Sequence, residues 1–382
     1  MRPAGKKRSL SFWISSCADM DRSVKSKPFT LNKGQRLIAI SDIHGSLGLL
    51  RQLLAKVRYV PVEDVLVLAG DLIEKGPQSL ATLRYIMELS AHPNVHVLMG
   101  NCDFVCKNIW NRYNLQFLHQ MLLQRQASIL HEMAAALQVT IDAHTDMEAL
   151  CTLLHQHYAR ELSWVDTLPQ VVYDDAHIFA HAGIMNEQDF GSDFREVMTY
   201  PHFLLHAPEF HRWVIVGHMP VSEYCHDIAR FHPLVDERRH IISIDGGNGV
   251  KHAGQLNALI LQDEMISWRS VDELPLCHAA RDVDPANHDP LFITWRESAI
   301  RILHKGASAD YCEHLASGRK LWIDHAFIHE GKDHQLCADD FTSYQMPLCR
   351  GERVYLVRRY ARFSLIKKAG ILGWCRNADL CP

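Results

Sequence analysis

Three short apolar runs near the start of the chain each end in polar residues. The runs RLIAI (residues 36–40), DVLVLA (64–69) and VHVLM (95–99) are followed directly by SDIHG, GDLIEKGP and GNCD. Between them, residues 46–57 and 79–89 carry apolar side chains at three- and four-residue spacing, which predicts amphipathic helices. Apolar strands that alternate with helices are typical of a sheet covered on both faces. We therefore expect an α/β domain that gathers the polar strand ends at one edge, where such sheets bind ligands.

The alternation of strand-like and helix-like segments stops between residue 105 and about residue 160. Apolar side chains recur there at helical spacing, first at Leu118, Leu122, Ile129 and Met133 and then at Met147, Leu150, Leu154 and Tyr158. We interpret this region as a helical insertion beside the sheet. Strand-like runs resume at residues 177–183, 212–218, 240–247 and 256–261.

A second domain is predicted at the C-terminal end. Residues 282–290 are rich in Asp, Pro, Asn and His, which is typical of a linker. Short β-branched and aromatic runs with Gly-containing turns follow, so we expect a small β-barrel domain over residues 288–382. Its last part, residues 351–380, resembles the bacterial SH3-like repeat pattern. The remaining predicted divisions are a basic tail at 1–35 and a catalytic domain at 36–280.

Charge and cysteine content narrow the class of protein. The net charge of −4 gives no overall attraction to nucleic acid or membrane surfaces, although the first 36 residues hold nine Lys or Arg against two Asp, 9 − 2 = +7. The apolar stretch LSFWIS in this tail is too short for a secretory signal, and no run approaches the length of a membrane span. Eleven cysteines without a CxxC pair argue against a disulfide framework or a thiolate zinc site. These features favour a cytoplasmic protein without nucleic-acid or membrane partners.

The polar residues that follow the strands form a set of candidate metal ligands. They are Asp42, His44, Asp71, Asn101, His181 and His218. Oxygen and imidazole donors suit a hard or borderline divalent ion such as Mn²⁺, Fe or Zn²⁺. Six donors exceed what one catalytic ion with open positions takes, so two ions that share a bridging carboxylate are the simplest arrangement.

The motifs SDIHG, GDLIEKGPQS, GNCD, HAGI and GHMP resemble those of the calcineurin-like metallophosphoesterases. Within this superfamily the chain looks most like the phosphoprotein-phosphatase branch, with its bacterial members and the diadenosine tetraphosphatases. The resemblance covers residues 36–262. It implies a β-sandwich flanked by helices in four layers.

The resemblance also implies a role for each candidate ligand. Asp42 and His44 would bind the first ion, Asp71 would bridge both ions, and Asn101, His181 and His218 would complete the second position. Two divalent ions would then polarise a phosphoryl group for in-line attack by a bridging hydroxide.

Further site residues follow from the same resemblance. Lys75 stands where the phosphatases carry a phosphate-contacting arginine, and Asn248 and Lys251 are candidate substrate contacts. Cys102 replaces the histidine that is thought to protonate the leaving oxygen, with Glu74 as its predicted partner. A thiol is a weaker acid than imidazolium for this step.

Three functions remain open from the sequence. The first is hydrolysis of phosphomonoesters, including phosphoserine or phosphothreonine in proteins. The second is hydrolysis of a dinucleoside polyphosphate or a diester, whose leaving group needs less protonation. The third is a non-catalytic scaffold that acts through the C-terminal β domain, which is also a candidate docking site for a protein partner.

Overall fold

The protein is described by a computed structural model over residues 20–125, 127–286, 289–331, 335–337 and 340–381. The chain forms two compact units. The first unit contains residues 1–219, 233–249 and 256–271, and the second contains residues 220–232, 250–255 and 272–382. Within the described residues, no helix combines the length and apolar character needed to cross a membrane.

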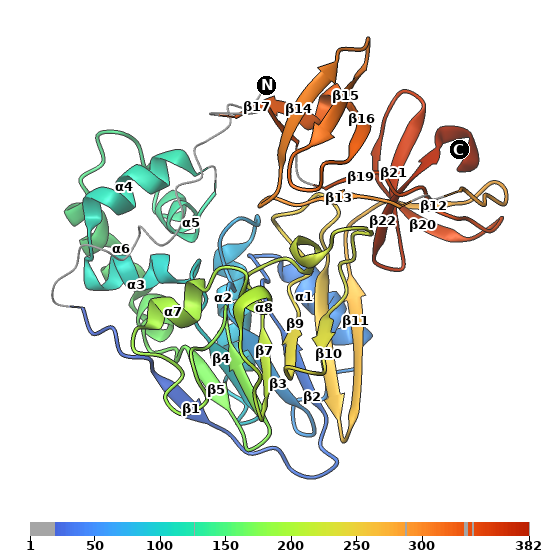
Figure 1. The fold of residues 1–382 in the computed structure, drawn as a ribbon. Helices are drawn as coiled ribbons and strands as arrows, with labels where there is room; N and C mark the ends of the chain where they lie inside the picture. The colour runs from blue at the N-terminus through green and yellow to red at the C-terminus, as the bar shows by residue number, and fades with distance from the viewer. Residues whose placement is uncertain (1–19, 126, 287–288, 332–334, 338–339, 382) are drawn as a thin grey trace. The chain divides into compact units, whose positions relative to one another are not determined.

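The first unit is built on two sheets (Figure 1). The first sheet has six strands, in the order β1 (Ser26–Pro28), β5 (Val171–Tyr173), β6 (His177–Ala180), β7 (Trp213–Val216), β9 (Ile241–Ser243) and β8 (Leu234–Asp236). The second has five strands, in the order β11 (Met265–Val271), β10 (Leu256–Gln262), β2 (Leu37–Ile40), β3 (Val65–Ala69) and β4 (Val95–Leu98). The strands β2, β3 and β4 are parallel, as are β6, β7 and β9, so their carboxyl ends lie on common edges.

The core of the first unit lies between these sheets. Alternate residues of the strands meet there, among them Leu37 and Ala39 from β2, Val67 from β3, Phe179 from β6 and Ile215 from β7. The intervening residues of β2 and β3 are also fully buried, which explains why these strands are apolar throughout rather than alternating. The predicted α/β sandwich is therefore confirmed.

Helices flank the sheets of the first unit. They are α1 (Leu47–Lys56), α2 (Ser79–Leu89), α3 (Phe104–Asn111), α4 (Leu115–Gln124), α5 (Ile129–Ala136), α6 (Met147–Asp166), α7 (Phe194–Thr199) and α8 (Phe203–His206). Helix α1 packs on β10 and β11, and α2 packs on α1. Helices α3 to α6 occupy the region of the predicted insertion and gather together in Figure 1. Helix α6 is kinked at Tyr158, whose φ and ψ are −130° and 24°.

The predicted basic tail contributes a strand to the first unit. Residues 1–19 of this tail lie outside the described residues. Strand β1 pairs in parallel with β5, and the amide N–H of Lys25 donates to the side-chain oxygen of Gln170 at 2.9 Å. The described part of the tail is therefore integrated into the six-stranded sheet.

The second unit consists of small antiparallel sheets (Figure 1). The four-stranded sheet has the order β12 (Leu276–His278), β20 (Arg353–Arg359), β21 (Phe363–Lys368) and β22 (Ile371–Arg376). The five-stranded sheet has the order β16 (Lys320–Asp324), β15 (Ala309–His314), β14 (Ala299–His304), β18 (Gln335–Cys337) and β17 (Ile328–Glu330). Strands β13 (Phe292–Ile293) and β19 (Phe341–Thr342) form a separate pair. The predicted all-β character of this region agrees with these sheets.

Two segments from the middle of the chain belong to the second unit. Residues 220–232 and 250–255 fall within the predicted catalytic domain at 36–280, so the compact units divide the chain differently from the predicted boundaries. The amide N–H of Phe231 donates to the carbonyl of Gly370 at 2.9 Å, and Phe231 and Ala253 lie in the same apolar cluster as Trp374. The chain passes between the two units five times, the last time between residues 271 and 272, and the predicted linker at 282–290 lies within the second unit.

Buried ion pairs tie these two segments to the C-terminal strands. The ammonium of Lys251 lies 2.6 Å from Glu223 Oε1, 3.4 Å from Asp340 Oδ1 and 3.9 Å from the centre of the Trp295 ring. The side chains of Lys251 and Glu223 are fully buried. Removing one member of such a pair leaves an uncompensated buried charge, which is strongly destabilising. We refer to Lys251, Glu223, Asp340 and Trp295 as the Lys251 cluster.

Candidate metal centre

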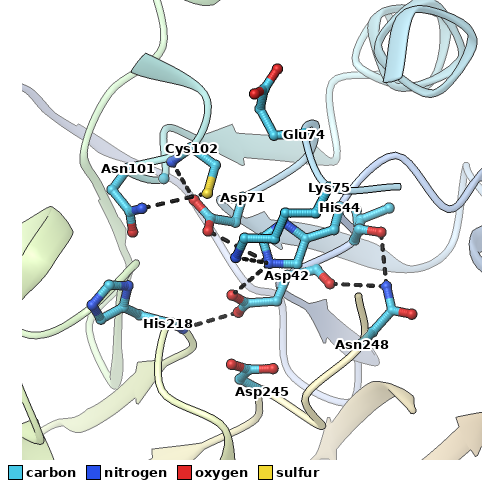
Figure 2. Close-up of polar contacts among 12 residues, drawn as sticks. Asp42, His44, Asp71, Glu74, Lys75, Asn101, Cys102, His218, Asp245 and Asn248 are labelled. Atoms are coloured by element: carbon cyan, nitrogen blue, oxygen red, sulfur yellow. Dashed lines mark hydrogen bonds and ion pairs between the residues drawn. The ribbon is translucent and has the colours of Figure 1, made fainter. Parts of the chain in front are cut away.

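The loops that follow the strands of both sheets bring together the residues predicted to bind metal. Asp42 and His44 follow β2, Asp71 follows β3 and Asn101 follows β4 in the five-stranded sheet. His181 and His218 follow β6 and β7 in the six-stranded sheet. Figure 2 shows the side chains of Asp42, His44, Asp71, Asn101 and His218 converging on one region.

Four of these residues have left-handed backbones. The φ angles are 53° for Asp42, 47° for His44, 51° for Asp71 and 68° for His218. Non-glycine residues adopt such angles at a cost of about 1–3 kcal/mol each, and they persist where the surrounding structure enforces them. The loops are therefore held in turns that aim these side chains at a common point.

Two glycines allow the loops after β3 and β4 to approach each other. A Cβ atom at Gly100 would lie 2.1 Å from the backbone nitrogen of Asp71 and 2.3 Å from its Oδ1. A Cβ atom at Gly70, whose φ is +84°, would lie 2.6 Å from the nitrogen of Gly100. The amide N–H of Cys102 donates to Asp71 Oδ1 at 2.7 Å across this contact. The glycine before each polar signature thus serves close backbone packing at the site.

The first group of donors contains Asp42, His44 and Asp71. The Nε2 atom of His44 lies 3.7 Å from Asp42 Oδ1 and 3.7 Å from Asp71 Oδ2. The other ring nitrogen, Nδ1, lies 3.5 Å from the carbonyl oxygen of Ile73. The amide N–H of His218 donates to Asp42 Oδ2 at 3.0 Å and fixes the rotation of that carboxylate.

The second group contains Asp71, Asn101, His181 and His218. The Nδ1 of His181 lies 3.0 Å from the carbonyl of Ala69, which places the ring proton on Nδ1 and leaves a lone pair on Nε2. This Nε2 lies 3.3 Å from Asp71 Oδ1 and 3.0 Å from Asn101 Oδ1. With the Asn101 oxygen in this orientation, three electron-pair donors face one another, which is unfavourable unless a cation lies between them.

The side-chain amide of Asn101 can serve the site in two orientations. With its oxygen toward the imidazoles it presents an electron pair beside His181 Nε2. In the reversed orientation its nitrogen would donate to His181 Nε2 at 3.0 Å and to His218 Nδ1 at 2.7 Å. The first orientation suits a bound cation and the second suits a cation-free site, because only an oxygen can act as a ligand.

The buried carboxylates of the site also favour a bound cation. Burial and the charge of Asp71 raise the pKa of Asp42 to about 7, and burial together with Asp42 raises the pKa of Asp245 well above its usual range. Burial acts in the same direction on Asp71, but the nearby His181, His44 and Lys75 hold the pKa of Asp71 below its usual range. Three buried carboxylates in one region are stable in the ionised form only when cations neutralise them.

The imidazoles are in the form that binds metal. Burial lowers the pKa of His44 and of His218 to about 3, so both rings are neutral at physiological pH. Neutral imidazole is the protonation state that metal coordination requires. The donors present therefore fit divalent metal ions.

Cys102 lies among the candidate metal ligands. Ligand atoms of His44, Asp71 and Cys102 all lie within 4.8 Å of one another. Burial and the charge of Asp71 raise the pKa of the Cys102 thiol well above its ordinary value. The thiol is therefore a poor proton donor in the arrangement shown.

Glu74 points away from the cluster in Figure 2. Its Oε1 accepts hydrogen bonds from the Ser128 hydroxyl at 2.7 Å and from the Ile129 amide at 2.8 Å, and its Oε2 forms an ion pair with Arg125. These contacts join the loop after β3 to the helical insertion. Glu74 is thus placed to position this loop, and its predicted pairing with Cys102 gains no support from these contacts.

The three predicted substrate contacts have different surroundings. Lys75 is exposed as a whole, but its ammonium turns inward to 3.0 Å from His44 Nε2 (Figure 2). The amide nitrogen of Asn248 donates to the carbonyls of Ile43 at 2.9 Å and Asp42 at 3.3 Å, which braces the loop after β2. Lys251 belongs to the second unit, where the carboxylates of the Lys251 cluster engage its ammonium.

Two further buried carboxylates of the site, those of Asp103 and Asp245, had no predicted role. Asp103 is fully buried, and its carboxylate accepts from the amides of Leu72 at 2.9 Å, Ile73 at 3.2 Å and Gly100 at 2.8 Å. It therefore locks the loop after β3 to the loop after β4. Asp245, which follows β9, lies beside Asp42 in Figure 2. Like the predicted ligands, it follows a buried strand.

The chain shows sequence similarity to a known family and to curated proteins. Residues 35–238 match the family model described as calcineurin-like phosphoesterase. Symmetrical bis(5'-nucleosyl)-tetraphosphatases from Yersinia pestis (strain Pestoides F) and Yersinia pseudotuberculosis serotype O:3 (strain YPIII) are each 33% identical over 153 residues. The match covers 39% of this chain, and the chain spans 43% of the length of each of these relatives.

Two solved phosphatase structures match part of this chain. A cold-active protein-tyrosine phosphatase of a Shewanella species is 15% identical with a TM-score of 0.44, covering 65% of this chain and 82% of that one. A protein serine/threonine phosphatase from Saccharomyces cerevisiae is 10% identical with a TM-score of 0.37, covering 67% and 85%.

Proposed function

Because the chain belongs to the calcineurin-like phosphoesterase family, we propose that it hydrolyses phosphate esters at a centre of two divalent metal ions. The observation that carries this proposal is the set of buried electron-pair donors that face one another. His181 Nε2 lies 3.3 Å from Asp71 Oδ1, and the carboxylates of Asp42 and Asp245 are buried in the same region (Figure 2). Folding alone gives no reason to collect these groups.

Each position would be held by the residues that already lie together. Asp42, His44 and Asp71 would hold the first ion, and Asp71, Asn101, His181 and His218 would hold the second. When bound, the two ions supply Lewis acidity and charge neutralisation for phosphoryl transfer to water. The family uses divalent metals, and Mn²⁺, Fe and Zn²⁺ fit these donors.

The chain's own residues prepare this centre. Asp103 holds the turns that carry Asp71 and Asn101, because its carboxylate binds amides from both loops. The His218 amide orients the Asp42 carboxylate, and Asn248 braces the backbone at Asp42. Glu74 couples the loop that follows Asp71 to the helical insertion. Such supporting contacts keep the ligands near a productive geometry.

The thiol at position 102 bears on the choice of substrate. A buried thiol with a raised pKa gives little help to a basic leaving group such as a serine alkoxide. A phosphoanhydride has a far less basic leaving group. We therefore favour hydrolysis of a dinucleoside polyphosphate, the substrate class that the printed name of the Yersinia relatives indicates for those enzymes. Phosphomonoesters, including phosphoserine and phosphothreonine in proteins, are the second candidate from the family resemblance.

Several finer points accompany this proposal. Manganese is our first candidate among the metals. It remains a prediction that the second unit is SH3-like and that it binds a protein partner. The ten cysteines of the described residues are free thiols, which supports the predicted cytoplasmic location.

A reconstitution experiment tests the proposal. Protein stripped with a chelator is assayed with Mn²⁺, Zn²⁺ or Fe²⁺ against diadenosine tetraphosphate, a phosphoserine peptide, and nitrophenyl mono- and diesters. We expect metal-dependent hydrolysis, with the dinucleotide preferred over the peptide. Asp71→Asn should lose metal and nearly all activity, whereas Asp263→Asn, at an exposed position, should behave as wild type.

Specific results would contradict the proposal. Retention by Asp71→Asn of full metal and more than about a tenth of the activity, a barrier change below about 1.4 kcal/mol, would exclude a bridging role for Asp71. A metal-loaded wild type that cleaves none of these substrates would favour the scaffold alternative.

A further inference from the structure

A lysine ammonium already occupies the edge of the first metal position. Lys75 Nζ lies 3.0 Å from His44 Nε2, and Figure 2 shows the lysine side chain turned toward the donor cluster. A protonated lysine has only hydrogens to give, so this contact requires His44 Nε2 to accept through its lone pair. The distance of 3.5 Å from Nδ1 to the Ile73 carbonyl agrees with a proton on the other ring nitrogen.

The same lone pair is the one that a metal ion would use. His44 Nε2 faces Asp42 Oδ1 and Asp71 Oδ2, each at 3.7 Å, so it points to the centre of the first donor group. An imidazole nitrogen has one lone pair in the ring plane, which can bind either a hydrogen or a metal ion, but not both.

We propose that the ammonium of Lys75 is a built-in competitor of the first metal ion, so that this ion binds only when Lys75 leaves His44. The positive charge of Lys75 also acts favourably on the Asp42 and Asp71 carboxylates, as a cation must in a buried acidic cluster. This inference rests on the proposed metal centre and adds to it an order of binding. The described contacts of His181 include no ammonium, and the neutral Asn101 amide need only turn its oxygen toward the ring, so the second position fills first.

The loop that carries Lys75 is built so that the side chain moves while the backbone stays. Glu74 and Lys75 have left-handed φ angles of 74° and 65°. The carboxylate of the neighbouring Glu74 accepts hydrogen bonds from Ser128 and Ile129. The backbone amide of Glu74 donates to the Ser79 hydroxyl at 3.0 Å. Displacement of the ammonium therefore requires rotation of a flexible four-carbon stem only.

Calorimetric titration of chelator-stripped protein with Mn²⁺ tests the competition without any assay of activity. Lys75→Met keeps the stem length and removes the charge, Lys75→Arg keeps a competing cation, and Lys33→Met is a matched control at an exposed lysine. We expect the weaker of two Mn²⁺ binding steps to tighten about tenfold to a hundredfold in Lys75→Met, the range of one charge-assisted hydrogen bond. Lys75→Arg and Lys33→Met should leave it near the wild-type value.

A stability measurement provides a second readout. In chelator, Lys75→Met should unfold at a lower temperature than wild type, because the acidic cluster has lost its internal cation. Saturating Mn²⁺ should remove this difference. Equal or weaker Mn²⁺ binding in Lys75→Met would overturn the competition, provided that Asp71→Asn abolishes binding. Absence of Mn²⁺ binding in every variant, including wild type, would instead overturn the metal centre itself.

Discussion

Gly100 offers the most direct test of how packing at the site controls metal binding. Gly100→Ala adds one methyl group, and that methyl would lie 2.1 Å from Asp71 N and 2.3 Å from Asp71 Oδ1. Ordinary van der Waals contact begins at 3.4 Å, so the overlap with the nitrogen is 3.4 − 2.1 = 1.3 Å. Because the obstructing atoms are backbone and a metal-ligand candidate, the loops after β3 and β4 must separate.

The expected cost is large for a single methyl group. Overpacking a buried site typically costs about 1–3 kcal/mol, and a clash with backbone belongs at or above the upper end of that range. Gly48→Ala is the matched control, because this glycine lies in helix α1 and a Cβ there would meet nothing within 4 Å. Alanine is favoured over glycine in helices by about 0.5–1 kcal/mol, so the control should stabilise the protein.

Urea unfolding in chelator and Mn²⁺ titration of the folded protein measure the two consequences. We expect Gly100→Ala to lower the free energy of unfolding by about 3 kcal/mol and to weaken Mn²⁺ binding, because the shifted loop moves Asp71. An unfolding free energy within about 0.5 kcal/mol of wild type would refute the reasoning. Lower stability with unchanged Mn²⁺ affinity would refute the link from this packing contact to the site.

Three further predictions concern other parts of the first unit. Cys102→His should accelerate phosphoserine hydrolysis about 10²-fold or more, and nitrophenyl phosphate far less, since a general acid matters most for basic leaving groups; equal changes would exclude a missing acid. Glu132 accepts from two amides at the start of α2, so Glu132→Gln should lower the unfolding free energy by about 0.5–2 kcal/mol, whereas the exposed Glu88→Gln should not. Burial lowers the pKa of His96 from 6.5 to about 4, so the unfolded chain binds a proton that the folded chain does not as pH falls through this range. Unfolding free energy should therefore fall from pH 6.5 to 4, and His96→Phe should flatten that slope; an unchanged slope would assign it to other groups.

Much of the first unit follows from local sequence. Buried parallel strands require apolar residues on both faces, so the runs at β2, β3 and β4 were recognisable, and the polar residues after them mark the carboxyl edge of the sheet. The same rule located His181 and His218 after β6 and β7. Asp245 obeys it too, and its place beside Asp42 could have been predicted from the run that precedes it.

The surroundings of Glu74 and Lys251 could not be predicted, because these residues contact residues far away in the sequence. The direction of Glu74 depends on Arg125 and Ser128, which lie 51 and 54 residues further along the chain. The burial of Lys251 depends on Asp340. The pattern of apolar and polar residues over 240–262 does not indicate that partner. A turn residue and a buried lysine therefore look alike in sequence when their partners come from another part of the chain.

The division of the second unit into three chain segments has a consequence for synthesis on the ribosome. Residues 220–232 and 250–255 emerge early, but the strand β22 that shares their apolar cluster ends 376 − 255 = 121 residues later. At about 5–20 residues per second, this gap lasts roughly 6 to 24 s. Until the later residues emerge, Phe231 lacks its contact with Gly370 and Lys251 has Glu223 but not Asp340, and both segments directly follow loops that carry metal-site residues. Newborn chains of this protein should therefore depend on chaperones at this stage more than a protein with two consecutive domains would.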